Sequence, residues 1–194
     1  MMMKLAIVAL GFSVIVSAVA DPVPVTVDNF IRAESDVYMA GLIKDSGGIG
    51  KFSHRREPAD IDKQTVIRLN RDTLYSSAVF DLDAGPVTIT LPDAGKRFRS
   101  MQLINQDHYA PLVSYEAGQH VIDRKLAGTR YAVVALRTLV DPADPEDIKK
   151  VHALQDAIKA SQEDSGSFEV PQWDPVSQKK VRDALLVLAS TESG

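Results

Sequence analysis

The feature that most constrains the fold is an alternation of apolar and polar side chains through the middle of the chain. It is clearest where Val87, Ile89 and Leu91 alternate with threonines. A period of two residues is typical of strands with one buried face. Because no helical pattern interrupts this region, it favours an antiparallel sandwich or barrel over a parallel sheet. Further extended segments are predicted at residues 65–82, 98–106, 112–115, 119–122 and 130–138.

The first extended segment carries one acidic residue on its apolar face. Alternate residues of a strand face the same side. Leu74 and Phe80 therefore share one side of this segment, and Asp72 is expected on that side too. We therefore expect the Asp72 carboxylate to point inward near the end of the sheet. An unpaired buried carboxylate costs several kcal/mol, so Arg71, His108 or a bound cation should lie beside it.

Helical periodicity precedes the β-rich region. Thr26 is the expected N-cap of a helix that ends at the glycine-rich residues 46–50. The buried stripe of this helix is expected to include Ala33 and Val37, which recur at helical spacing. The polar residues 53–58 that follow predict a surface loop.

Two more helices follow the β-rich region, and each begins with the same pair of residues. Asp144 and Asp174 are the expected N-caps, and a proline follows each at the first helical position. Trp173 is expected to anchor the C-terminal segment against the core. The predicted fold class is therefore α+β: an antiparallel β-sandwich or jelly-roll-like core flanked by one N-terminal and two C-terminal helices.

The first twenty residues are typical of a secretory signal peptide. They hold one charge, at Lys4, then an apolar run, and end in the small-x-small pattern that places cleavage after Ala20. The alternative is a transmembrane anchor, but the run is shorter than the roughly 20 residues that a span needs. We expect a periplasmic or secreted protein with no membrane anchor after cleavage. It would have one β-rich domain at residues 21–160, then a linker and a C-terminal helix at 161–194 that packs on the domain.

Composition excludes several classes of function. A net charge of −4 and a pI near 5.5 argue against nucleic acid as a partner, because phosphate binding needs a basic surface. The absence of cysteine rules out disulfides, thiolate metal sites and cysteine nucleophiles. The chain has neither a Gly-x-Ser-x-Gly motif nor a His-x-x-x-His pair. No cofactor is expected.

Two polar runs, at residues 70–75 and 105–109, stand at the ends of predicted strands. A histidine can act as a general acid or base, and a carboxylate beside it can orient its ring. In this hypothesis His108 is the acid or base, an aspartate orients it, an arginine binds an anion and two tyrosines donate hydrogen bonds. The candidate catalytic residues are Arg71, Asp72, Tyr75, Asp107, His108 and Tyr109, with Asn70 and Asn105 as candidate ligand-binding residues.

Each run also has other interpretations. Residues 70–72 are typical of a turn network that fixes the end of a sheet and carries out no chemistry. A divalent metal held by His108 and nearby carboxylates is a further possibility, although no residue is assigned as a metal ligand.

Several ordered motifs resemble the bacterial domain-of-unknown-function 1254 family over about residues 25–160. This resemblance implies a β-rich fold of jelly-roll character and places the chain with the compact, exported, single-domain form. Larger members carry a second such domain after this one. The activity of the family is not established, so no catalytic residue follows from it. The motifs that carry the resemblance lie at residues 68–76, 90–97, 105–109, 137–145 and 154–156.

Two functional hypotheses follow from the sequence. The first is an exported enzyme that acts on a small polar or envelope-derived molecule through an Arg/Asp/His/Tyr pocket. The alternative is a non-catalytic periplasmic ligand-binding or envelope-interaction module. Both imply a small-molecule ligand or a partner chain, and the sequence decides neither the enzymatic question nor the oligomeric state.

Overall fold

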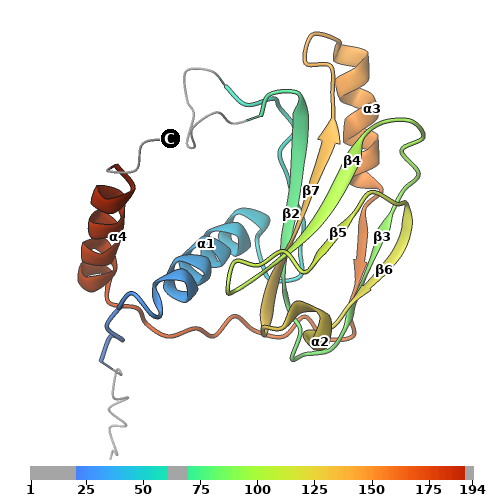
Figure 1. Ribbon diagram of the computed structural model, residues 1–194. Helices are drawn as coiled ribbons and strands as arrows, with labels where there is room; N and C mark the ends of the chain where they lie inside the picture. The colour runs from blue at the N-terminus through green and yellow to red at the C-terminus, as the bar shows by residue number, and fades with distance from the viewer. Residues whose placement is uncertain (1–20, 61–69, 191–194) are drawn as a thin grey trace, which may run out of the picture.

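The computed structural model describes residues 21–60 and 70–190, which form two sheets with helices around them (Figure 1). The strands are β1 (Ser53–His54), β2 (Thr73–Asp81), β3 (Val87–Leu91), β4 (Arg99–Asn105), β5 (Leu112–Ser114), β6 (Gly118–Ile122), β7 (Tyr131–Leu139) and β8 (Lys159–Ser161). A five-stranded sheet has the order β1-β2-β7-β4-β5, and a three-stranded sheet has the order β6-β3-β8. Every pairing between these strands is antiparallel.

The two sheets pack face to face over an apolar core. Val87, Ile89 and Leu91 of β3 are buried, while the threonines between them are partly exposed. They belong to one cluster with Met101 and Leu103 of β4 in the other sheet. The alternation that predicts half-buried strands therefore corresponds to a real division between core and surface, and the predicted sandwich is confirmed.

Four helices surround the sandwich in the described part of the chain. They are α1 (Phe30–Ser46), α2 (Arg124–Ala127), α3 (Pro145–Asp156) and α4 (Pro175–Ser190). Figure 1 shows α1 on the side of the five-stranded sheet that faces away from the three-stranded one, with α4 beyond α1. Met39 of α1 packs there against Val79 and Val133, whose side chains leave the outer face of the sheet.

The start and buried face of α1 differ from the prediction. The helix begins at Phe30 with Asn29 at the N-cap position, and Thr26 donates its backbone N–H to Asn29 Oδ1 at 2.8 Å. Val37 is 53% exposed, whereas Asp36 is only 1% exposed. The predicted stripe was wrong here because α1 turns a hydrogen-bonded carboxylate, not the Val37 side chain, toward the sheet.

The helix α3 closes one end of the sandwich. Asp144 accepts the Glu146 N–H at 2.9 Å and a proline stands at the first helical turn, which confirms the predicted start. The side chain of Gln155 is fully buried and donates to the carbonyl oxygens of Arg55 and Tyr75. Val151 of α3 adds an apolar contact to the same end.

Three short elements are absent from the prediction. The helix α2 follows its N-cap Asp123, and β8 pairs with β3 where we predicted the start of a linker. The expected surface loop at 53–58 instead begins with β1, where His54 Nδ1 lies 2.8 Å from Ser76 Oγ. Elements of two to four residues carry too little periodicity to be recognised in a sequence.

Some sequence predictions fall outside the described residues. These are the leader at residues 1–20 and the beginning of the extended segment at 65–69. Among the helices that are described, none has the length and apolar character needed to cross a bilayer.

Candidate functional site

The two polar runs lie at opposite ends of the five-stranded sheet. Strands β2 and β4 both pair antiparallel with β7, so they run in the same direction. The run at 70–75 covers the start of β2, whereas the run at 105–109 follows the end of β4. The seven residues of β4 separate them by about 20 Å at about 3.3 Å per residue. The structure therefore does not bring Arg71, Asp72 and Tyr75 together with His108.

Residues 70–72 form a turn network. Asp72 donates its backbone N–H to Asn70 Oδ1 at 3.3 Å, and Arg71 Nε donates to the carbonyl oxygen of Ala59 at 3.1 Å. The Asp72 side chain is exposed, so the predicted inward carboxylate was wrong. Strand parity fails there because β2 begins only at Thr73, and parity does not extend into the preceding turn.

Tyr75 lies within β2 and is half-buried. Its carbonyl oxygen accepts the backbone N–H of Arg55 at 2.8 Å and the side chain of Gln155 at 3.2 Å. The backbone of Tyr75 therefore holds the end of the sandwich near α3.

Residues 105–109 form a compact turn organised by a buried amide. Asn105 Oδ1 accepts the backbone N–H groups of Asp107 and Tyr109 at 3.0 and 2.9 Å, and Asn105 Nδ2 donates to the Ala127 carbonyl at 2.9 Å. His108 takes a left-handed backbone conformation with φ 65°. Asp107 pairs with Arg32 of α1, with Arg32 Nε 3.0 Å from Asp107 Oδ1. Tyr109 is 71% exposed.

A second buried side chain in this turn was not singled out from the sequence. Gln106 donates to Asp36 Oδ1 at 2.6 Å, and its Oε1 accepts the backbone N–H of Tyr131 at 3.2 Å. Trp173 Nε1 donates to Asp36 Oδ2 at 3.0 Å, which confirms the predicted anchoring role of Trp173. The position of Asp36 three residues after the buried Ala33 was the available signal, because a polar residue on a buried helix face needs partners.

A cavity of about 320 Å³ lies between α1 and the outer face of the five-stranded sheet, beside this turn. Of its lining residues, Met39 and Val133 are buried, whereas Tyr38 and His108 are exposed. Of the residues selected from the sequence, His108 alone is among those that line this cavity. The lining residues are Glu34, Ser35, Tyr38, Met39, Ile104, His108 and Val133. We call this space the α1 cavity.

Glu34 connects the α1 cavity to the last helix. Its carboxylate accepts hydrogen bonds from Gln178 Nε2 at 2.6 Å and from Arg182 Nε at 3.2 Å. Ser177 Oγ also accepts the backbone N–H of Val25 at 2.8 Å. Because Gln178 and Arg182 of α4 already bind Glu34, the polar side chains of the lining left for a ligand are those of Ser35, Tyr38 and His108.

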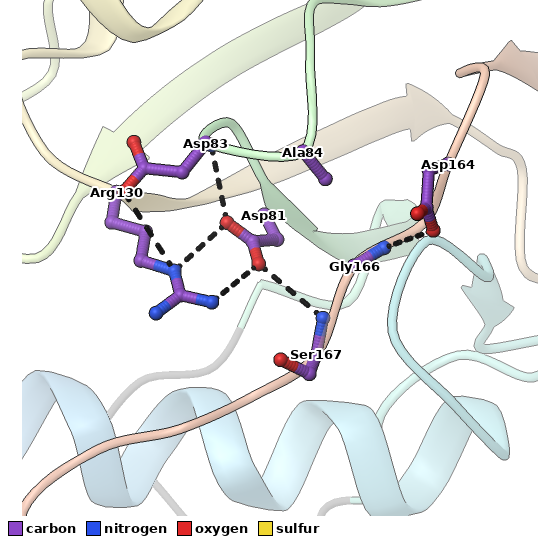
Figure 2. Close-up of a pocket in the computed structure, with 7 residues that line it drawn as sticks. All are labelled: Asp81, Asp83, Ala84, Arg130, Asp164, Gly166 and Ser167. Carbon is purple, nitrogen blue, oxygen red and sulfur yellow. Dashed lines mark hydrogen bonds and ion pairs between the residues drawn. The ribbon is translucent and has the colours of Figure 1, made fainter.

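A second cavity, of about 380 Å³, surrounds Asp81 (Figure 2). Arg130 donates two hydrogen bonds to the Asp81 carboxylate, from Nε at 3.0 Å and from Nη2 at 2.8 Å. The backbone N–H groups of Asp83 and Ser167 donate two more. Burial alone would raise the pKa of Asp81, but these hydrogen bonds outweigh it and hold the pKa below its usual range. Each carboxylate oxygen of Asp81 thus accepts two hydrogen bonds from the protein itself. We therefore assign this cluster a structural role, in which it holds the segments of Asp81, Arg130 and Ser167 together.

The described residues offer no ready metal site. No group of three or more histidine, cysteine, aspartate or glutamate side chains among them is placed to hold a metal ion.

Comparisons with known proteins agree with this fold. A family model described as Protein of unknown function (DUF1254) matches residues 49–120, which confirms over that stretch the resemblance drawn from the motifs. The chain is also similar to the crystal structure of the VPA0106 protein from Vibrio parahaemolyticus, at 15% identity and a TM-score of 0.57. That match covers 76% of this chain and 41% of the other, so the chain spans about two fifths of that protein's length. At this identity the likeness shows the fold alone. No curated protein matches the sequence.

Proposed function

We propose that this protein is a non-catalytic binding module that takes a small amphipathic molecule into the α1 cavity. The observation that carries the proposal is an apolar space with few polar groups, built between a helix and a sheet. Small-molecule sites have this character, with volumes that start near 300 Å³. The apolar part of the ligand would contact Met39, Ile104 and Val133, and its polar group would meet Ser35 or His108.

The separation of the two polar runs favours binding over acid–base catalysis. A general base must lie within hydrogen-bond reach of the proton that it abstracts, and the enzymatic hypothesis adds a carboxylate that orients His108. Arg71 and Asp72 are engaged in a turn at the far end of the sheet, and Asp107 is paired with Arg32. Among residues 21–60 and 70–190, no carboxylate makes a hydrogen bond or ion pair with His108, so the orienting partner that the enzymatic hypothesis requires is missing there.

The proposal includes an exported location, in the periplasm or outside the cell. Its support is the pattern of the first twenty residues, with cleavage after Ala20. N-terminal sequencing of the protein recovered from the periplasm or medium of a bacterial host should begin at Asp21. Recovery of the full-length chain from the cytoplasm alone would contradict this part of the proposal.

Thermal unfolding with three probes tests the binding function. Octanol, octanoate and octylamine share an apolar tail and differ in the charge of the polar group. At least one should raise the melting temperature in a concentration-dependent manner, because a ligand that binds only the folded state stabilises it. The charge of the effective probe would identify the polar group that the cavity prefers.

A matched pair of variants localises the effect. Ser35→Phe places a ring in the cavity and should abolish the response, whereas Ala40→Phe adds the same ring at an exposed position of α1 and should preserve it. A response that survives in Ser35→Phe, or no response to any probe in the wild type, would overturn the proposal.

A further inference from the structure

Arg99 points into the sandwich at the end where α3 packs. It is the first residue of β4 and has the same parity as Met101 and Leu103, whose side chains belong to the core. Its cross-strand neighbour on β7 is Thr138, which is 2% exposed. Directly opposed residues of an antiparallel pair lie on the same face, so the Arg99 and Thr138 side chains are adjacent.

The Arg99 guanidinium is buried without partners for two of its nitrogens. The residue is 4% exposed, and Nε and Nη1 have no hydrogen-bond acceptor in the described structure. Burial lowers the pKa of Arg99, and the charge of Asp93 only partly opposes this effect. Arginine nonetheless stays protonated in proteins, so the core of this sandwich contains an uncompensated cation.

The other buried or half-buried arginines of the fold show what is missing at Arg99. Arg130 is paired with Asp81, and Arg97 donates to Asp147 Oδ2 at 2.8 Å. Asp93, whose negative charge raises the pKa of Arg99, is exposed. It accepts the backbone N–H of Gly95 at 2.8 Å. A buried charge that lacks a partner costs several kcal/mol, and nothing in the proposed binding function explains why Arg99 is there.

The sheet leaves one side of Arg99 uncovered by a strand. The last pairing of β5 with β4 is Ser114 with Met101, so β5 ends before it reaches Arg99. On the other side Arg99 is flanked by β7 through Thr138. The planar fork of a guanidinium matches the two oxygens of a carboxylate, which suits it to an acceptor that no strand supplies on this side.

We infer that Arg99 is the anchor of an anion site between the two sheets, which takes the carboxylate group of a small organic acid. Thr138, adjacent to Arg99 across the strand pair, would donate a further hydrogen bond from its hydroxyl. The acidic Asp93 nearby disfavours a dianion such as phosphate and so favours a singly charged carboxylate. This site lies at the α3 end of the sandwich, whereas the α1 cavity lies on the outer face near the opposite end. The two are independent.

Propionate is the probe, and the side-chain N–H signals of arginine provide a readout that needs no variant. In a ¹⁵N-labelled protein the Arg99 Nε–H signal should shift and saturate with propionate at constant ionic strength. Sodium phosphate at the same ionic strength should produce a smaller shift. Arg99→Lys keeps the charge but loses the fork, and should bind propionate at least tenfold more weakly.

Thermal unfolding of variants adds a second measurement. Arg99→Met should lose the propionate-dependent rise in melting temperature, while it unfolds no earlier than the wild type in chloride, because it removes an unpaired buried charge. The control is Arg137→Met, which alters an exposed arginine of the neighbouring strand on the opposite face. The inference is overturned if the Arg99 Nε–H signal does not move with propionate, or if a folded Arg99→Met protein responds as the wild type does.

Discussion

Gly166 passes so close to Asp81 that a side chain at this position would displace neighbouring atoms. A Cβ atom at this position would lie 2.5 Å from Asp81 Oδ2 and 2.9 Å from the Ala84 Cβ, and the backbone φ is +69°. The close approach lets the adjacent Ser167 donate its backbone N–H to Asp81. The segment after β8 is thereby fastened to the end of β2 (Figure 2).

Gly166→Ala should therefore destabilise the fold by about 2–4 kcal/mol, a range typical of a clash against a buried charged group combined with backbone strain. The matched control is Gly95→Ala, where φ is +60° but no atom lies within 4 Å of the added Cβ. That variant should lose only the cost of the left-handed conformation, about 1 kcal/mol. Urea denaturation measures both, and equal losses would show that the approach to Asp81 is unimportant.

His54 should make stability depend on pH. Burial, and then the charge of Arg56, lower the pKa of His54, while Asp156 partly opposes them. Because the folded pKa lies below the unfolded value of about 6.5, the unfolded state binds more protons as the pH falls. The free energy of unfolding should therefore decrease as the pH drops through about 6.5, and level off below the folded pKa.

His54→Gln should flatten this part of the pH profile and keep a polar partner for Ser76. The control is His120→Gln, on the edge strand β6, whose side chain bonds the Glu116 carbonyl. Denaturation at several values between pH 7.5 and 5.5 gives the slopes. If His54→Gln and the wild type have the same slope, His54 is not responsible for the dependence.

At the scale of single residues, features that depend on neighbours along the chain were predictable from the sequence, whereas contacts between distant segments were not. The caps at Asp144 and Asp174 depend on neighbours along the chain, and both form as predicted. Asp36 and Gln106 depend on contacts between α1, the 105–109 turn and the C-terminal segment. Those contacts exist only in the folded chain, so residue type alone could not reveal them.

At the scale of elements, strands with one buried face were predictable and short ones were not. The burial of β3 repeats the apolar–polar alternation of its sequence. The strands β1 and β8 are held by pairing with β2 and β3, and their own residues carry no apolar pattern. A strand of two or three residues is defined by its neighbour, and a local pattern does not contain that information.

The helix α4 is attached through few contacts, which predicts independent local opening. Gln178 is its buried residue, and Glu34 holds both Gln178 and Arg182. Glu34→Ala should increase amide hydrogen exchange in residues 175–190 at least tenfold, while the melting temperature changes little because the sandwich core is untouched.

Lys179→Ala is the control for this prediction, because it removes an ion pair with Asp183 that lies within α4 itself. Its exchange in the same residues should stay close to that of the wild type. Exchange in Glu34→Ala that is no faster than in this control would contradict the view that Glu34 holds α4 in place.

At the scale of the whole molecule, sheet topology decides which polar groups meet. One polar run precedes its strand and the other follows its strand. Since β2 and β4 run in the same direction on either side of β7, the two runs are held at opposite ends. Both runs could be recognised in the sequence, but their separation depends on β7, whose partners are fixed only in the complete sheet.

The same topology leaves the outer face of the five-stranded sheet for α1 (Figure 1). The cavity between them contains His108 from one polar run and no residue from the other. We therefore propose that a small amphipathic ligand binds under α1, at one end of the sheet, without contact to the residues at the other end.

The most direct test is a titration of the ¹⁵N-labelled protein with the most stabilising of the three eight-carbon probes, followed by backbone amide chemical shifts. If a ligand binds under α1, the shifts should saturate at Ser35, Ile104 and His108, with no change at Arg71 and Asp72. Shifts that gather at Arg71 and Asp72, or that spread evenly over the surface without saturation, would contradict it.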